Sequence, residues 1–113
     1  MKHEKKRITK IIDELMFYLF SMGANNIDVS FKQEQELCVI TFKSDYNFSK
    51  RNKLFKLVKC LNYEKQEEME EYFWELTGNY DMDTELSLVG MMIDEAKVYY
   101  DDEKIEIILI RHK

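Results

Sequence analysis

The chain lacks proline and has only three glycines, two histidines and two cysteines among its 113 residues. So few glycines exclude the glycine-rich loops that cradle phosphate groups, and neither a Gly-x-Ser-x-Gly nor a His-Glu-x-x-His motif occurs. His3 and His112 lie close to the two ends, where a general base is seldom held firmly in place. We therefore expect no catalytic residue, no bound metal and no cofactor.

The scarcity of cysteine and the absence of a long apolar run indicate where the protein works. Cys38 and Cys60 lie far apart, without the close spacing of a metal site, and we expect both to be buried free thiols. No apolar run approaches the roughly 18 residues that a membrane-spanning helix needs. The charged start, Met1–Arg7, leads into an amphipathic helix and not into a signal peptide. We expect a cytoplasmic protein that does not contact a membrane.

The formal net charge of -5 argues against a nucleic-acid partner, because duplex binding depends on Lys and Arg side chains that neutralise phosphates. One basic strip is present, made of Lys50, Arg51, Lys53, Lys56 and Lys59. We interpret this strip as the solvated face of a helix. A cation site on the glutamate-rich segment 64–75 is equally unsupported, since its carboxylates are spread around a predicted helix.

The first half of the chain is organised by a long amphipathic helix that begins near Glu4. Its apolar residues recur at steps of three and four and are Ile8, Ile11, Ile12, Leu15, Met16, Leu19 and Met22. Gly23 is placed to end the helix in a left-handed conformation. Ile27–Phe31 then alternates apolar and polar residues, which predicts a strand with one buried face.

The remaining pattern predicts the element order α-β-β-α-α-α-β-β. The later segments are a strand over Leu37–Lys43, helices around Leu54–Leu61, Met69–Leu76 and Leu86–Ala96, and strands over Val98–Tyr100 and Lys104–Arg111. We expect one domain, residues 1–113, with an α+β fold: a two-layer sandwich of a four-stranded mixed sheet with helices on one face. The two most apolar strands, Leu37–Lys43 and Lys104–Arg111, are expected to be neighbours at the centre.

Two small residues carry local predictions. Ser49 is placed to cap the second helix. Gly90 lies inside the last helix, where glycine costs about 1 kcal/mol relative to alanine. We expect Gly90 to allow close packing against another backbone.

Exposed aromatic residues suggest an interface. Phe17 projects from the polar side of the first helix, opposite the apolar stripe. With Phe20 or Trp74 beside it, the patch would bury enough area for a dimer. We therefore predict Phe17, Phe20 and Trp74 as interface residues.

Four segments, in order, resemble parts of a known family. Glu14–Ala24 is similar to a helix written Glu-Leu-x-x-Asn-Ala-x-x-His-Gly, and Ile27–Phe31 follows it as an Ile-x-Val-x-x strand. Leu37–Asp45 resembles a strand that leads into an Asp-x-Gly loop, and Leu86–Val98 is similar to a helix written Leu-x-Leu-Val-x-x-x-x-Asp-Glu-Val-x-Val. These are the boxes of the Bergerat-type ATPase domain of gyrases, histidine kinases and MutL proteins, and most of all of its small anti-sigma-factor kinases. The resemblance implies two parallel inner strands.

The departures from that family remove its nucleotide chemistry. Glu14 is kept, but Tyr18 stands where the family has its magnesium-binding asparagine. Asp45 lies in a loop without the glycine of the adenine anchor, and Thr84 stands among the residues that replace the phosphate-binding glycines. The resemblance therefore implies a vestigial site at Glu14, Tyr18, Asp45 and Thr84 that holds no cofactor.

Three hypotheses follow. The first is a non-enzymatic regulatory or protein-interaction module on a nucleotide-free histidine-kinase-ATPase-like scaffold, which binds a protein partner or itself. The second is an ATP-binding, anti-sigma-factor-like serine kinase domain with a rebuilt site. The third is an unrelated α+β structural homodimer.

Overall fold

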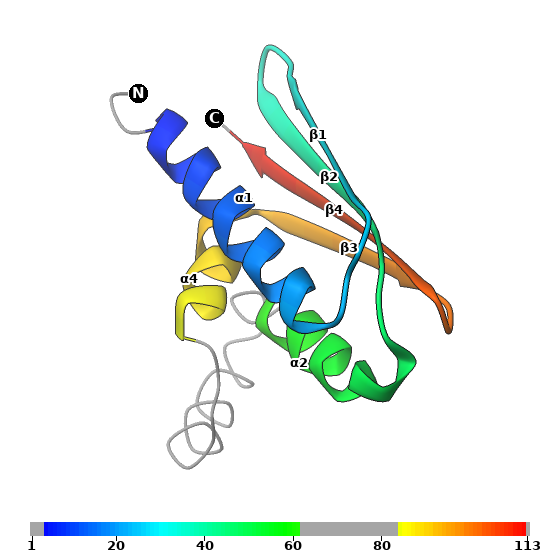
Figure 1. Ribbon diagram of the computed structural model, residues 1–113. Coiled ribbons are helices and arrows are strands. Elements are labelled where there is room, and N and C mark those ends of the chain that lie inside the picture. The colour runs from blue at the N-terminus through cyan, green and yellow to red at the C-terminus, as the bar shows by residue number, and fades with distance from the viewer. Residues whose placement is uncertain (1–3, 62–83, 113) are drawn as a thin grey trace.

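The computed structural model describes residues 4–61 and 84–112, with the backbone alone at Thr84, Glu85, Ser87 and Leu88. The helices are α1 (Glu4–Ser21), α2 (Arg51–Leu61) and α4 (Thr84–Met92), and a short 3-10 turn, η1 (Phe48–Lys50), precedes α2. The strands are β1 (Ile27–Gln33), β2 (Leu37–Asp45), β3 (Glu95–Tyr100) and β4 (Lys104–His112) (Figure 1). The helix predicted around Met69–Leu76, together with Trp74, lies outside the described residues.

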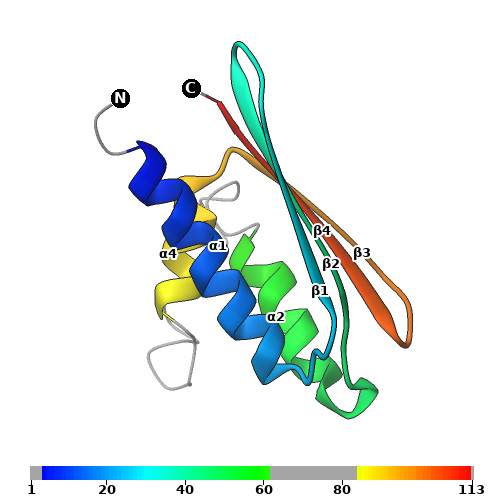
Figure 2. The same cartoon turned by 45° about the horizontal axis from the view of Figure 1, so that its top comes forward.

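The four strands form one sheet in the order β1-β2-β4-β3, and the described helices cover one of its faces (Figure 2). This arrangement confirms the two-layer α+β sandwich. It also confirms that the two most apolar strands, β2 and β4, are neighbours at the centre, with β1 and β3 at the edges.

The prediction of a mixed sheet with parallel inner strands is wrong. β2 and β4 run antiparallel, with a register from Leu37 opposite His112 to Asp45 opposite Lys104, and the two outer pairings are antiparallel as well. The cause is the end of the sheet at which α4 delivers the chain. α4 ends beside the last residues of β4, where the Arg111 side chain donates a hydrogen bond to the Met92 carbonyl. β3 therefore starts at the end where β2 starts, and β4 must return against both.

α1 buries the apolar stripe that its sequence predicts. Ile8, Ile11, Leu15, Leu19 and Met22 are all buried in the core. Gly23 has a φ of +88°, and the backbone N–H of Ala24 donates to the Leu19 carbonyl across the end of the helix. The predicted left-handed glycine at this position is confirmed.

The central strands supply the other half of the core. Cys38, Ile40 and Phe42 of β2 and Ile105, Ile107 and Leu109 of β4 are buried, and their positions in the register place them on one face. Cys38 and Cys60 are both buried, and neither forms a disulfide within the described residues, as predicted.

Two local predictions are wrong. The last helix was expected to reach Ala96, but α4 ends at Met92 and Ala96 lies in β3. Asp94 redirects the chain, because its backbone N–H donates to the Ile110 carbonyl and its carboxylate accepts the backbone N–H of His112. Ser49 is not the cap: the Asn47 side chain accepts the Ser49 N–H at 2.9 Å at the start of η1.

Gly90 confirms the predicted close approach of two backbones. A Cβ atom built at Gly90 would overlap the carbonyl oxygen of Cys60 and would lie 3.5 Å from the Leu61 Cα atom. α4 therefore crosses the end of α2 with no room for a side chain.

We predict that Gly90→Ala destabilises the protein by about 1–3 kcal/mol, because the overlap outweighs a gain in helix propensity of about 1 kcal/mol. Chemical denaturation followed by circular dichroism measures the change. Lys56→Ala, on the exposed face of α2, is the control and should stay within about 0.5 kcal/mol of wild type. A Gly90→Ala protein as stable as wild type would contradict the contact.

Candidate functional site

Tyr18, which stands where the resembled family has its magnesium-binding asparagine, joins two helices. The residue is buried, and its hydroxyl donates to the Lys53 carbonyl of α2 at 2.7 Å. The Lys53 Nζ atom lies 5.7 Å from the centre of the Tyr18 ring. One turn earlier, the Glu14 carboxylate pairs with Lys10 at 3.1 Å. The first of the resembled boxes thus makes structural contacts at both positions.

Asp45, which stands near the position of the adenine anchor in the resembled family, organises the turn between α1 and β1. Its Oδ1 atom accepts the backbone N–H groups of Asn25 at 2.8 Å and Asn26 at 3.0 Å. These hydrogen bonds, led by the one from Asn26, hold the pKa of the Asp45 carboxyl below its ordinary value. Thr84 begins α4, and its side chain is not described.

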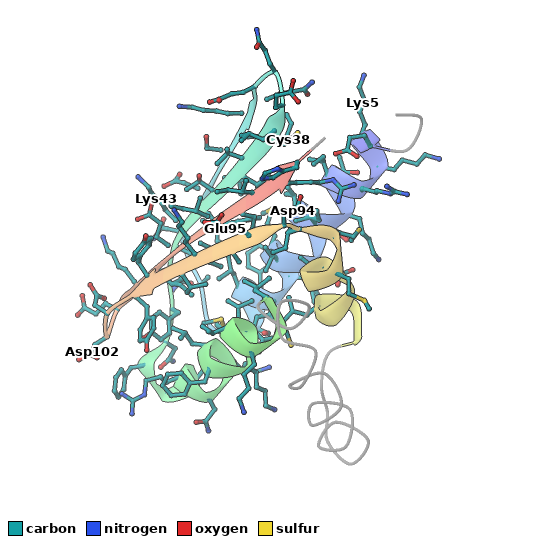
Figure 3. All side chains as sticks on the ribbon, turned by 180° about the vertical axis from the view of Figure 1, so that it is seen from behind. Lys5, Cys38, Lys43, Asp94, Glu95 and Asp102 are labelled. Atoms are coloured by element: carbon teal, nitrogen blue, oxygen red, sulfur yellow. The ribbon has the colours of Figure 1, made fainter. Side chains whose placement is uncertain are left out.

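An open hollow of about 600 Å³ lies where β1 and β2 meet the β3–β4 hairpin. Of the four vestigial positions, Asp45 alone lines it. Across the strands, Asp28, Lys43, Glu106 and Tyr99 occupy one register row. The row alternates in charge, so it gives no net attraction for a phosphate group. Figure 3 shows Lys43 on the side of the sheet away from the helices and Asp102 at the hairpin tip.

Arg111 forms a second organised group, which the sequence analysis missed. Its Nε and Nη2 atoms donate to the two carboxylate oxygens of Glu4 at 2.7 and 3.0 Å, and Nη1 donates to the Met92 carbonyl. The hydrogen bond from Arg111 lowers the pKa of Glu4, and the Glu4 carboxylate raises the pKa of Arg111. The group ties the start of α1 to the ends of α4 and β4. The one signal in the sequence is an arginine at an inward-facing position of an apolar strand.

The aromatic–arginine surface, formed by Phe48, Arg51, Phe55 and Tyr100, was also missed. The Arg51 guanidinium carbon lies 4.3 Å from the centre of the Phe48 ring and 5.9 Å from that of Phe55. The Phe55 and Tyr100 rings meet edge to face, with 6.3 Å between centres. All three rings are exposed. The four-residue spacing of Arg51 and Phe55 on the polar side of α2 is the signal that could have found it.

A third surface contains the predicted interface residues. The α1–β1 surface consists of Phe17 and Phe20 on α1 and Val29 and Phe31 on β1, which are 69%, 57%, 37% and 44% exposed. α1 and β1 lie on the near side of the molecule in Figure 1 and on the far side in Figure 3. The predicted exposure of Phe17 is confirmed. Whether Trp74 joins this surface is not tested, because Trp74 lies outside the described residues.

No protein-family model, curated protein or solved structure matches the chain. Within residues 4–61 and 84–112, no group of three or more His, Cys, Asp or Glu side chains is arranged to hold a metal ion. In the same described part, no helix is both long enough and apolar enough to cross a membrane. The resemblance to the Bergerat-type ATPases therefore stays a prediction, and the antiparallel inner strands depart from the parallel pair that it implies.

We predict that Asp45→Ala lowers the melting temperature by several degrees at neutral pH, because two turn N–H groups lose their acceptor. The folded-state pKa of Asp45 is depressed, so its stabilisation is present above the ordinary aspartate pKa of 3.8 and is lost as the pH falls through the folded-state value. Thermal melts from neutral to acidic pH should show the wild-type and Asp45→Ala curves converging. Asp13→Ala, at an exposed position of α1, is the control and should melt like wild type at neutral pH.

Proposed function

We propose that this chain is a non-enzymatic protein-interaction module that binds an acidic partner segment through the aromatic–arginine surface. The observation that carries the proposal is the position of the Arg51 guanidinium, over the exposed Phe48 ring at 4.3 Å and 5.9 Å from the centre of the exposed Phe55 ring. Aromatic and arginine side chains are enriched where protein interfaces have their largest energies. An exposed group of this composition is therefore suited to protein recognition.

The surface is ordered before a partner arrives. Arg51 is held against Phe48 and Phe55, and Phe55 contacts Tyr100 of the neighbouring strand β3. Side chains already fixed by such contacts lose less conformational entropy on binding, so more of the contact energy remains as affinity.

The charge of the surface favours an acidic partner. The exposed face of α2 carries Arg51, Lys56 and Lys59 and no acidic residue. The end of the surface at Tyr100 adjoins the acidic tip of the β3–β4 hairpin. There the Asp101 carboxylate already accepts the backbone N–H groups of Glu103 and Lys104. A partner's acidic groups would lie toward Lys56 and Lys59, and its apolar groups would cover Phe55 and Tyr100. A single-stranded nucleic acid is disfavoured by the net charge of -5.

We further propose that the scaffold is a nucleotide-free relative of the Bergerat-type ATPases with a regulatory role in the cytoplasm. Two observations support the loss of nucleotide chemistry: Tyr18 is buried against α2, and Asp45 is engaged by two backbone N–H groups. The two free buried thiols support a reducing compartment.

We predict that a random copolymer of glutamate and tyrosine binds the protein more tightly than polyglutamate of equal length. Phe55→Ala should weaken copolymer binding about tenfold, as expected for loss of an interface hot spot. Fluorescence anisotropy measures both affinities, and Phe20→Ala, an exposed phenylalanine of the other surface, is the matched control. Equal binding of the two polymers, unaffected by Phe55→Ala, would contradict the proposed surface. Preferential binding of oligothymidylate that depends on Phe55 would indicate a nucleic-acid site instead.

We predict that magnesium-ADP gives no binding heat with the wild-type protein in calorimetric titration. Tyr18→Asn should not create binding, because the phosphate-binding glycines of the resembled family are also missing. The same substitution should destabilise the protein, since it removes a buried ring and its bond to Lys53. Low-micromolar binding by wild type would support the kinase-like alternative.

A further inference from the structure

Within residues 4–61 and 84–112, nothing pairs with the outer edge of β1. It is the outermost strand of the sheet, and its residues after Ile27 are all exposed. Unpaired strand edges attract other strands, and native proteins usually protect them with proline, bulges or charged side chains. The chain contains no proline, and every residue of β1 keeps its partner in the register with β2.

Hydrogen bonds at the two ends of β1 show which of its backbone N–H and carbonyl groups point toward β2 and which point toward the outer edge. The Asp45 N–H donates to the Asn26 carbonyl, and the Glu34 N–H donates to the Leu37 carbonyl. Even-numbered residues of this strand therefore direct their backbone groups at β2. Because successive residues of a strand alternate, the N–H and carbonyl groups of Ile27, Val29, Phe31 and Gln33 point to the free edge.

The side chains of β1 are complementary to themselves around Ser30. In an antiparallel pair of two β1 strands centred on Ser30, Asp28 lies opposite Lys32 of the second copy, and Val29 lies opposite its Phe31. This register pairs odd-numbered residues with odd-numbered residues, as the free backbone groups require. It also uses all seven residues of the strand. Moving the centre to Phe31 would shorten the overlap and set Asp28 against Glu34.

We propose that two copies of this chain associate through β1, centred on Ser30, to form one continuous eight-stranded sheet. Each copy contributes its four strands. The pairing is two-fold symmetric, so it closes after two copies. The proposal does not depend on the function proposed for the aromatic–arginine surface.

The apolar side chains of β1 fit this assembly. Val29 and Phe31 share a register row with the buried Phe42 and Ile40, on the side of the sheet that carries the helices. They nevertheless remain 37% and 44% exposed, since the helix layer does not extend over this edge. In the dimer each packs against the other across the two-fold axis. Phe17 and Phe20 of α1 are exposed as well.

The charges on β1 select a second copy over an unrelated strand. Lys32 on a free edge normally opposes pairing with another strand. Only a strand with an acidic residue at the matching position neutralises Lys32, and a second β1 provides Asp28 there. Asp28 and Lys32 would form a non-hydrogen-bonded pair, in which side chains of antiparallel strands come closest. β3 differs, because its Glu95 and Lys97 already pair with each other at 3.5 Å.

Sedimentation velocity of the full chain over micromolar to millimolar concentrations tests the assembly. Wild type should form a dimer. Asp28→Lys and Lys32→Asp should each weaken the dimer about tenfold, because both symmetric ion pairs become repulsive. The double variant Asp28→Lys/Lys32→Asp should restore it. An equimolar mixture of the two single variants should also dimerise, since each then supplies the charge that the other lacks.

Lys97→Asp on the opposite edge strand is the matched control and should sediment like wild type. A wild-type protein that is monomeric at all concentrations overturns the proposal. Single variants that dimerise as well as wild type overturn it too. If Phe17→Glu dissociates the dimer while the charge variants do not, the interface is α1 and not the β1 edge. Circular dichroism verifies that each variant is folded, and the mixing experiment needs no further substitution.

Discussion

The pairing of β2 with β4 holds the two halves of the chain together at the centre of the sheet. Its nine register pairs join a strand from the first half of the sequence to the last strand. One row of this pair, including Ile40, Phe42, Ile107 and Leu109, is the apolar floor on which the helices rest. This long-range pairing provides the surface that the helix layer covers. The Glu4–Arg111 ion pair and the contact at Gly90 then tie α1 and α4 to the same unit.

The extent of the described helices determines which side chains on that face of the sheet are exposed to solvent. The helices bury the central strands and leave the inward row of β1 partly uncovered, which is why Val29 and Phe31 are exposed on the helix side of the sheet. A strand in this position is stabilised by one neighbour on one edge alone. The same coverage leaves η1, the outer face of α2 and Tyr100 accessible at the other side. The exposure of Val29 and Phe31 thus follows from an edge of the sheet that the described helices do not cover.

Local patterns predicted the parts of the fold that local physics controls. The apolar stripe of α1, the left-handed Gly23, the exposure of Phe17 and the order of the strands all depend on periodicity or on backbone sterics. The direction of β4 relative to β2 could not be predicted in this way, because it depends on where α4 delivers the chain. The end of α4 at Met92 was missed for a related reason: sheet hydrogen bonds of Asp94 override the helical pattern that continues to Ala96.

The candidate sites also combine features that the local sequence shows with contacts that only the fold creates. Asp45 was expected in a vestigial, empty nucleotide site because of its neighbours in sequence. Its contacts with Asn25 and Asn26 depend instead on the return of β2 to the start of β1. The aromatic–arginine surface also joins segments far apart in sequence, since Tyr100 comes from β3 and Phe55 from α2. The spacing of Arg51 and Phe55 is visible in the sequence. Tyr100 joins them only because the sheet places β3 beside Phe55 of α2.

The positions of the two surfaces have a consequence for binding. β1 lies at one edge of the sheet, and β3, which carries Tyr100, lies at the opposite edge. A dimer joined through β1 therefore leaves both aromatic–arginine surfaces uncovered and holds them at opposite ends of one eight-stranded sheet. A partner with two acidic segments on a linker long enough to span that sheet would bind the second surface at a raised effective concentration. A partner with a short linker would gain nothing, because rigid strands fix the separation. Self-association would then favour long or repeated partners over compact ones. The surface that contacts the partner would be the same in both cases.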